Sequence, residues 1–247
     1  MLGITLESYG KDGYNLSPNF GVARGDFKHL TAINKFGFNG TVGSTFETVW
    51  SESSVYTYPA TQGTILLTSS DSDDNGSTVQ VTGLDGDYNE VTETLEVGGS
   101  EGTQNFIRVY RMILINANTG TSNVGKISAR HTDQSSTQIT VAAIPATIGQ
   151  TLMTNYTVPA GYSAYITRFY STVDVKDKQA TIIGVARPFG QNCFNTKAYF
   201  TSNGNTVNYH FDTPLKFPAK TDFEVRAKSP TGVGITGVYD LILEQNT

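Results

Sequence analysis

Short segments in which apolar and polar residues alternate recur along most of the chain, and they restrict it to folds built from β-strands. In one of them, Phe223 and Val225 fall on one side and Glu224 and Arg226 on the other, as in a strand with a single buried face. Turn-forming stretches such as GLDGDYN and SNGN separate these segments, and no helical period extends over ten residues. The predicted strands are residues 55–58, 64–69, 77–83, 90–97, 105–115, 137–144, 163–173, 181–186, 205–211, 222–227 and 237–244.

The composition favours the same fold class. Tyr and Phe occur 13 times each, glycine occurs 25 times, and charged residues make up only 16% of the chain, which is typical of half-buried pleated sheets joined by turns. We therefore predict an all-β protein of tandem antiparallel β-sandwich domains with jelly-roll-like topology, preceded by an extended N-terminal arm.

The predicted domain boundaries depend on where the hydrophobic periodicity is absent and on a short internal repeat. Residues 1–45 mix glycine, asparagine and isolated aromatics without a sustained period, so they are predicted to form the arm. The sequence YTYPA at 56–60 recurs as YTVPA 100 residues later, which fits two sandwich domains, although proline-containing turns alone could produce so short a repeat. The predicted domains are residues 46–147, which are acidic, and residues 148–247.

The net charge of −5 is unevenly distributed. Eleven acidic residues and no Lys or Arg lie between residues 36 and 107, whereas residues 108–247 hold thirteen basic and eight acidic side chains. The acidic segment is expected either to face water or to meet a basic surface on another copy or another protein. Because the chain has no dense basic patch, no apolar run of membrane length and no secretion signal, we expect neither nucleic acid nor membrane as a partner.

The turn DSDDNG, which begins at Asp71, raises the question of an ion site. Asp71 and Asp73 match the first and third positions of a helix-flanked calcium loop, but the twelfth position, which needs a bidentate glutamate, is Thr82. Strand-like segments flank the turn where that loop requires helices. We expect a polar turn and no cofactor. The alternative is a weak Ca²⁺ site that uses Asp71, Asp73 and Asp74.

The sequence offers no convincing catalytic motif. GVGITG at 232–237 has the glycine spacing of a dinucleotide-binding turn, but only ten residues follow and they resemble a strand. His29, His131 and His210 are far apart, and no GxSxG or HExxH motif occurs. The single cysteine, Cys193, cannot form an internal disulfide and is expected to be a small packing residue. We therefore predict that the protein is not an enzyme.

Several stretches together resemble one family, the virion structural proteins of tailed bacteriophages, especially phages of cyanobacteria and other marine bacteria. The most specific are the acidic turn followed by GLDGDYNE and the TVPAG turn. In that family a longer glycine-containing insertion often follows the serine and aspartate run, and its shortness here weakens an ion site further. The matching stretches are FGFNGTVGSTFETVW (36–50), VYTYPAT (55–61), TSSDSDDNGSTVQVTGLDGDYNEVTETLEVGG (68–99), SNVGKISAR (122–130) and GQTLMTNYTVPAGYSAYITRFYSTV (149–173), within a resemblance that covers most of residues 34–245.

The resemblance implies a component of the phage particle, made in the host cytoplasm, and leaves its position in the virion open. The leading hypothesis is a capsid decoration, cement or head-fibre protein that docks through its arm on the major capsid protein or another virion protein. We expect a symmetric homo-oligomer, for which a trimer is one option. Aromatic side chains in a polar arm are typical interface anchors, so Phe27, Phe36, Phe38 and Trp50 are the candidates, with capping of the first sandwich as their alternative role.

A second hypothesis is a receptor-recognition module of a tail or fibre that binds host surface glycans. Tyrosine-rich and asparagine-rich loops can stack on sugars, and Tyr199 and Tyr209 in the segment YFTSNGNTVNY are the candidate contacts. A third hypothesis, a baseplate or tail component, differs from the first only in its location.

Overall fold

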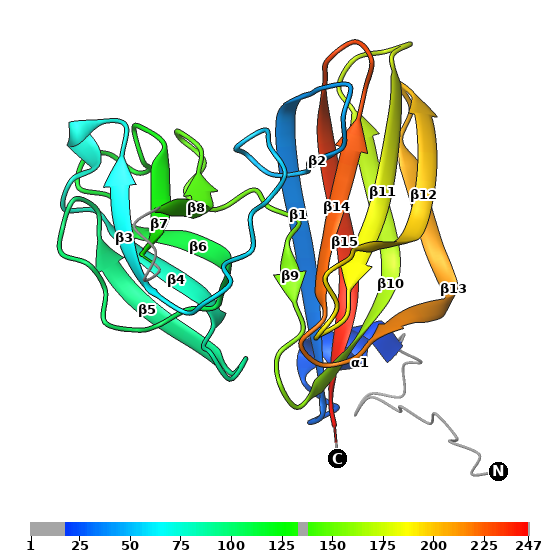
Figure 1. The fold of residues 1–247 in the computed structure, drawn as a ribbon, viewed down its shortest axis with the longest axis horizontal. Helices are drawn as coiled ribbons and strands as arrows, with labels where there is room; N and C mark the ends of the chain where they lie inside the picture. The colour runs from blue at the N-terminus through cyan, green and yellow to red at the C-terminus, as the bar shows by residue number, and fades with distance from the viewer. Residues whose placement is uncertain (1–17, 133–137, 247) are drawn as a thin grey trace, which may run out of the picture.

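The computed structural model describes residues 18–132 and 138–246. The chain forms two lobes of antiparallel sheets, which we call the sandwich lobe and the inserted lobe (Figure 1). The all-β prediction is confirmed, since strands make up 56% of the chain and helices 4%. No helix in the described ranges is long and apolar enough to cross a membrane.

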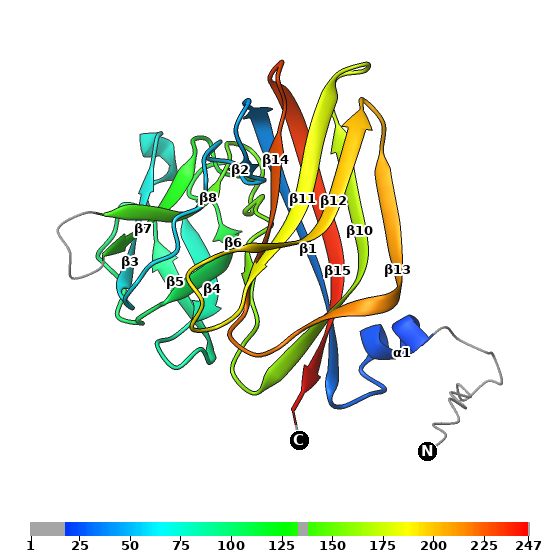
Figure 2. The same cartoon turned by 45° about the vertical axis from the view of Figure 1, so that its right-hand side comes forward.

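The sandwich lobe consists of two facing sheets, seen on the right of Figure 2. The first sheet has the strand order β1 (Leu30–Val42), β15 (Val233–Gln245), β10 (Tyr162–Val173) and β13 (Val207–Phe217). The second has the order β12 (Asn195–Asn203), β11 (Gln179–Arg187), β14 (Asp222–Lys228) and β2 (Glu47–Thr48), with β9 (Tyr156–Thr157) also paired to β14. A short helix, α1 (Pro18–Arg24), precedes β1.

The inserted lobe is smaller and has two three-stranded sheets. One has the order β3 (Thr64–Ser69), β7 (Ile127–Thr132) and β8 (Ile139–Ile144). The other has the order β5 (Glu90–Glu96), β4 (Thr78–Leu84) and β6 (Arg108–Asn116), and a 3-10 turn, η1 (Ser72–Asp74), joins β3 to β4.

Each lobe is built around its own hydrophobic core. In the sandwich lobe, inward-facing side chains such as Phe169, Phe223 and Tyr239 fill the space between the sheets. In the inserted lobe, Ile65 and Phe106 belong to a second cluster of buried side chains. Burying one large apolar side chain stabilises the folded state by about 1.5–3 kcal/mol. The alternating sequence pattern therefore leads to two cores, with the polar residues of the same strands left for the surface.

Part of the predicted arm is an integral strand of the sandwich lobe. β1 pairs with β15 along its length, so the prediction of an extended arm is wrong for residues 30–42, while residues 1–17 lie outside the described residues. At Gly37, a Cβ atom would lie 2.4 Å from the Val49 carbonyl oxygen and 2.7 Å from the Thr154 amide nitrogen. Glycine at this position permits close packing of the three backbone segments. Because glycine has no side chain, it also weakens the alternation of apolar and polar residues from which a strand is predicted.

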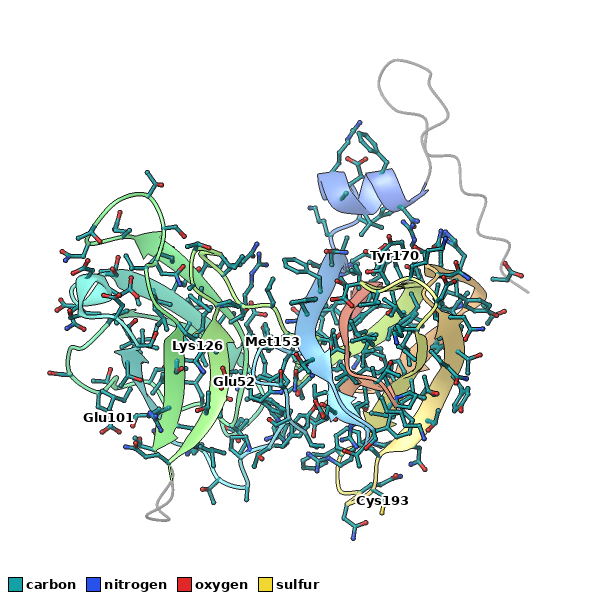
Figure 3. All side chains as sticks on the ribbon, turned by 90° about the horizontal axis from the view of Figure 1, so that it is seen from above. Glu52, Glu101, Lys126, Met153, Tyr170 and Cys193 are labelled. Carbon is teal, nitrogen blue, oxygen red and sulfur yellow. The ribbon has the colours of Figure 1, made fainter. Side chains whose placement is uncertain are left out.

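The two lobes are not consecutive in the chain. The predicted domains, 46–147 and 148–247, follow one another, whereas in the structure β3 to β8 are inserted between β2 and β9 of the sandwich lobe. The chain leaves and re-enters the sandwich lobe through two neighbouring segments, which meet at a β-bridge between Trp50 and Met153. Figure 3 shows Met153 between the two lobes. β1 and β15 lie near opposite ends of the chain, yet they pair in one sheet. The inserted lobe is therefore formed by a segment within the sequence of the sandwich lobe.

Replacing Gly37 with alanine tests whether β1 is packed into the sandwich lobe. Because the new methyl group would overlap backbone atoms on both neighbouring segments, we expect Gly37→Ala to lower the free energy of unfolding by about 1–3 kcal/mol or more. Gly40→Ala is the matched control, since the nearest atom to a Cβ there belongs to the Phe38 ring at 3.5 Å. Urea denaturation would measure both, and equal stability of the two variants would contradict the packing of β1.

Candidate functional site

A cleft of about 500 Å³ lies between the two lobes. Thr31 and residues 33–36 of β1 form one wall, and side chains from β4, β5 and β6 of the inserted lobe form the other. Residues 150–162, which return the chain to the sandwich lobe, contribute to the lining. A cavity of this size with mixed polar and apolar walls is typical of a small-molecule site, so we take the cleft as the candidate functional site.

Lys35 is the most unusual residue of the cleft. Its side chain points inward from β1, is 7% exposed, and its Nζ donates a hydrogen bond to the Tyr110 carbonyl oxygen at 2.6 Å across the lobe boundary. Burial, together with the positive charge of Arg111, lowers the pKa of Lys35 to about 7. A cation that is desolvated and held near a second cation would be stabilised by an anion that entered the cleft.

Two tyrosines of the cleft lie near the carboxylate of Glu90. The Tyr110 hydroxyl donates a hydrogen bond to Glu90, and the Tyr110 and Tyr156 rings lie 5.0 Å apart. Burial raises the pKa of both tyrosines, so both hydroxyls stay protonated at neutral pH. The Tyr156 hydroxyl is buried and has no hydrogen-bond partner among the described residues. An unsatisfied buried hydroxyl is costly, and a polar ligand would remove that cost.

A buried ion network joins the two lobes on another side of their boundary. Arg108 from β6 donates to the two carboxylate oxygens of Asp222 on β14 at 2.8 and 3.1 Å, and its Nη1 donates to the Pro59 carbonyl oxygen at 2.9 Å. Arg187 Nε donates to Asp222 Oδ2 at 3.1 Å, and Thr157 Oγ1 donates to Oδ1 at 2.7 Å. Asp222 therefore neutralises two guanidinium groups from different lobes, with its hydrogen-bonding capacity filled.

The network continues along the outer side of the second sheet of the sandwich lobe. Glu224 is fully buried, accepts a hydrogen bond from Thr48 Oγ1 at 2.9 Å and pairs with Arg226, and burial raises its pKa. The Phe194 ring lies 4.8 Å from the Arg187 guanidinium and 4.6 Å from that of Arg226. Cations stacked on aromatic rings keep part of their electrostatic stabilisation when water is removed. These contacts extend the charged network within the sandwich lobe.

The predicted ion turn forms a structural cap. The Asp71 side chain accepts a hydrogen bond from the Asp73 amide at 3.0 Å, as expected for a polar turn. Asp74 is 1% exposed and its carboxylate accepts from the backbone amides of Val124 and Gly125 at 2.7 and 2.8 Å. Within the described residues, no group of three or more His, Cys, Asp or Glu side chains is placed to hold a metal ion.

The predicted arm anchors have different environments. Trp50 is buried in the core of the inserted lobe, and its indole nitrogen donates to the Ser54 carbonyl oxygen at 2.9 Å, so its alternative role, capping a core, is the one found. Phe27 contacts α1 beside Gly21, as the short distance from its ring to a Cβ placed there indicates. Phe36 and Phe38 lie on the outer face of β1, half-buried and 36% exposed, respectively.

The predicted glycan contacts do not form one platform. Tyr199 on β12 is 62% exposed, whereas the neighbouring Phe200 faces the core and stacks on Phe169, so Tyr199 points to the opposite face of its sheet. Tyr209 is on the core side of β13, with its ring 5.6 Å from Phe200 and 4.9 Å from Phe211. The two tyrosines therefore face different surroundings.

Cys193 is exposed in a loop after β11, at the side of the sandwich lobe away from α1 (Figure 3). The expectation that it packs in the interior is wrong, because β11 ends before the residue and the chain turns through a proline- and glycine-containing stretch. Sequence analysis also missed Lys35, Arg111 and Glu90. The signal for Lys35 is its place between Ile33 and Gly37, on the inward face of a strand that was not recognised.

Comparison with known proteins gives little. No family model and no curated protein matches the chain. Two solved structures that it resembles distantly are described as the structure of infectious bursal disease virus Gt strain and the crystal structure of the infectious bursal disease virus VP2 subviral particle. The first is 8% identical over 89% of this chain and 78% of that chain, with a TM-score of 0.17, and the second is 11% identical over 88% and 76%, with a TM-score of 0.18. At these TM-scores the similarity supports no conclusion about function.

Removing the charge of Asp222 should strongly destabilise the protein. In Asp222→Asn, the buried guanidinium groups of Arg108 and Arg187 lose their counter-ion, so we expect the free energy of unfolding to fall by about 3–5 kcal/mol. Glu52→Gln, which breaks a more exposed pair with Lys126, should cost less than about 1 kcal/mol. Urea denaturation of the unchanged protein and the two variants would measure these free energies of unfolding. Similar losses in both variants would show that the Asp222 network stabilises the fold no more than a surface ion pair does.

The lowered pKa of Lys35 predicts a pH dependence of stability. The unfolded chain keeps this lysine protonated up to about 10.5, whereas the folded chain releases the proton near pH 7, so the unfolded state binds more protons between these values. The free energy of unfolding should therefore rise from pH 7 to pH 9.5, by an amount on the order of a few kcal/mol. Lys35→Met should flatten this rise, as measured by urea denaturation across the pH range, and an unchanged slope would contradict the assignment.

Proposed function

We propose that this chain is a non-enzymatic structural protein of a tailed-bacteriophage virion, in the class of capsid decoration, cement or head-fibre components. The all-β scaffold with two separate cores and a buried ion network between its lobes supports this proposal. Such a scaffold is rigid, so many copies can bind to a capsid shell in the same conformation. The family resemblance of the sequence points to the same class. The proposed partners are the major capsid protein or another virion protein, and further copies of the chain.

The observation that carries the proposal is the outer face of the first sheet of the sandwich lobe. We call Phe36, Phe38, Tyr170 and Val238 the docking face. Phe36 and Tyr170 both have Val238 as their Cα partner, so the three form one row across β1, β15 and β10. All four side chains are half-buried or exposed, as expected of a surface that becomes buried on binding.

The helix α1, which precedes β1, lies on this side of the molecule. In α1, Val22 is 5% exposed and lines a cavity with Ala32 and Ile242 of the same outer face, and Figure 3 shows Tyr170 on the side where α1 lies. The hypothesis of a docking arm at residues 1–45 no longer holds for residues 30–42, because these residues form a strand of the sandwich lobe. We infer that docking uses the docking face together with the segment before α1.

Substitutions on the docking face should weaken attachment to the particle. We expect a Phe38→Ser, Tyr170→Ser variant to bind at least about tenfold more weakly to heads that lack this protein, because two central aromatic contacts are lost. Tyr199→Ser, on an exposed residue of the second sheet, is the matched control and should bind like the unchanged protein. Co-sedimentation with purified heads would measure binding, and unaltered binding of the docking-face variant would reject this surface.

Copy number separates the proposed location from the tail and baseplate alternatives. A shell component is expected in roughly hundreds of copies per particle and a tail or vertex component in far fewer, because each follows the symmetry of its surroundings. Quantitative mass spectrometry of purified virions would give this number.

A further inference from the structure

Lys35 and Arg111 form a cationic end of the lobe cleft, and neither has an ion-pair partner within the described residues. The Lys35 ammonium group has three donors, and the acceptor that it contacts is the Tyr110 carbonyl oxygen at 2.6 Å. Arg111 lines the same cleft from β6, is exposed, and is close enough for its charge to affect Lys35. An anion with two oxygens placed between the ammonium and guanidinium groups would relieve their repulsion and accept charge-assisted hydrogen bonds from both.

Next to this cationic end, the cleft has a second end that is rich in hydroxyl groups, and Tyr110 contributes to both. Tyr110 donates to Glu90, which is the acidic group of the lining, and the unpartnered hydroxyl of Tyr156 lies beside it, while Tyr162 is also part of the wall. Glu90 would repel a second carboxylate at this end but would accept hydrogen bonds from ligand hydroxyl groups. The Tyr156 hydroxyl could donate a hydrogen bond to a ligand hydroxyl group or accept one from it, and either bond would give the buried Tyr156 oxygen a partner.

The remaining lining suits a polyhydroxylated molecule. Gln80, Thr82 and Gln150 supply amide and hydroxyl groups, and Ile33 and Leu243 supply apolar surface for the C–H bonds of a ring. The volume of about 500 Å³ is within the range of small-molecule sites.

We propose that the lobe cleft binds a small acidic sugar, with its carboxylate held between Lys35 and Arg111 and its hydroxyl groups directed to Glu90, Tyr156 and the polar wall of the inserted lobe. The inference is separate from the virion proposal, because it concerns ligand binding in the cleft and not attachment to a particle, although Phe36 of the docking face also lines the cleft.

Binding at this site is linked to a proton. The free protein holds Lys35 about half protonated at pH 7, and a carboxylate beside it favours the charged form, so the ligand binds with uptake of a proton above that pH. The other charged or titratable groups of the cleft lining are Arg111, Glu90, Tyr110, Tyr156 and Tyr162, and Tyr239 is the Cα partner of Lys35 on β15. Burial raises the pKa of Tyr110, Tyr156 and Tyr239, which keeps these three neutral. If only the protonated lysine binds, affinity falls about 20-fold from pH 6.5 to pH 8.5.

The test is a protein-observed NMR titration of the full chain with sodium D-glucuronate, which is ionised at both pH values, and with D-glucose as the uncharged comparison. We expect glucuronate to bind at pH 6.5 with shift changes at Thr82, Gln150 and other cleft amides, to bind about 20-fold more weakly at pH 8.5, and to bind at least about tenfold more tightly than glucose. Arg111→Gln should weaken glucuronate binding about tenfold and move the midpoint of its pH dependence upward, because the charge that lowers the pKa of Lys35 is removed.

Lys197→Gln on β12, an exposed position of the sandwich lobe, is the matched control and should behave like the unchanged protein. Because Arg111 is also exposed, both variants are expected to fold, and thermal denaturation would verify it. Absence of glucuronate binding at pH 6.5 would overturn the proposal. Equal affinity for glucose, or an Arg111→Gln variant with unchanged affinity and pH midpoint, would overturn it as well.

Discussion

The relative position of the two lobes depends on the pairing of Arg108 with Asp222 across their boundary. The guanidinium of Arg108 contacts both oxygens of a carboxylate on the other lobe and two backbone carbonyl oxygens. Taking such charges out of water is costly, and the cost is offset only when geometry and hydrogen bonding are nearly complete. A change in the angle between the lobes would break this geometry, so the network selects one arrangement out of the many that a two-segment connection permits.

The same boundary creates the cleft. Lys35 reaches from the sandwich lobe to the Tyr110 carbonyl oxygen of β6, so one wall carries the cation and the other wall carries its hydrogen-bond acceptor. Part of the acidic character of residues 36–107 lies on the exposed face of β5 in the inserted lobe, which carries Glu90 at the cleft and Glu96 at the end of the strand. Asp74 differs, because its carboxylate is buried and its oxygens accept hydrogen bonds from two backbone amides and from the Ser69 hydroxyl.

The fold class and most strands could be predicted from the sequence, because alternation in segments such as 222–227 reflects burial of one face. β1 could not, since Gly37 and Gly40 interrupt its pattern and its partner β15 lies about 200 residues further along the chain. Residues 55–58 alternate in the same way but pair with no strand, because Tyr56 and Tyr58 pack on Trp50 and the arginines of the lobe boundary. The cleft combines residues from β1, β6 and β9, and no sequence pattern indicates which distant segments meet.

The bridge between Trp50 and Met153 places the two ends of the inserted lobe next to each other. When the first and last residues of an inserted domain lie side by side, the domain can be lengthened, shortened or replaced while the sheets that flank it keep their register. The sandwich lobe can thus serve as a constant frame that presents exchangeable modules. Related proteins would then diverge most in the module, and recombination at residues 50 and 153 would graft a new surface onto an unchanged base.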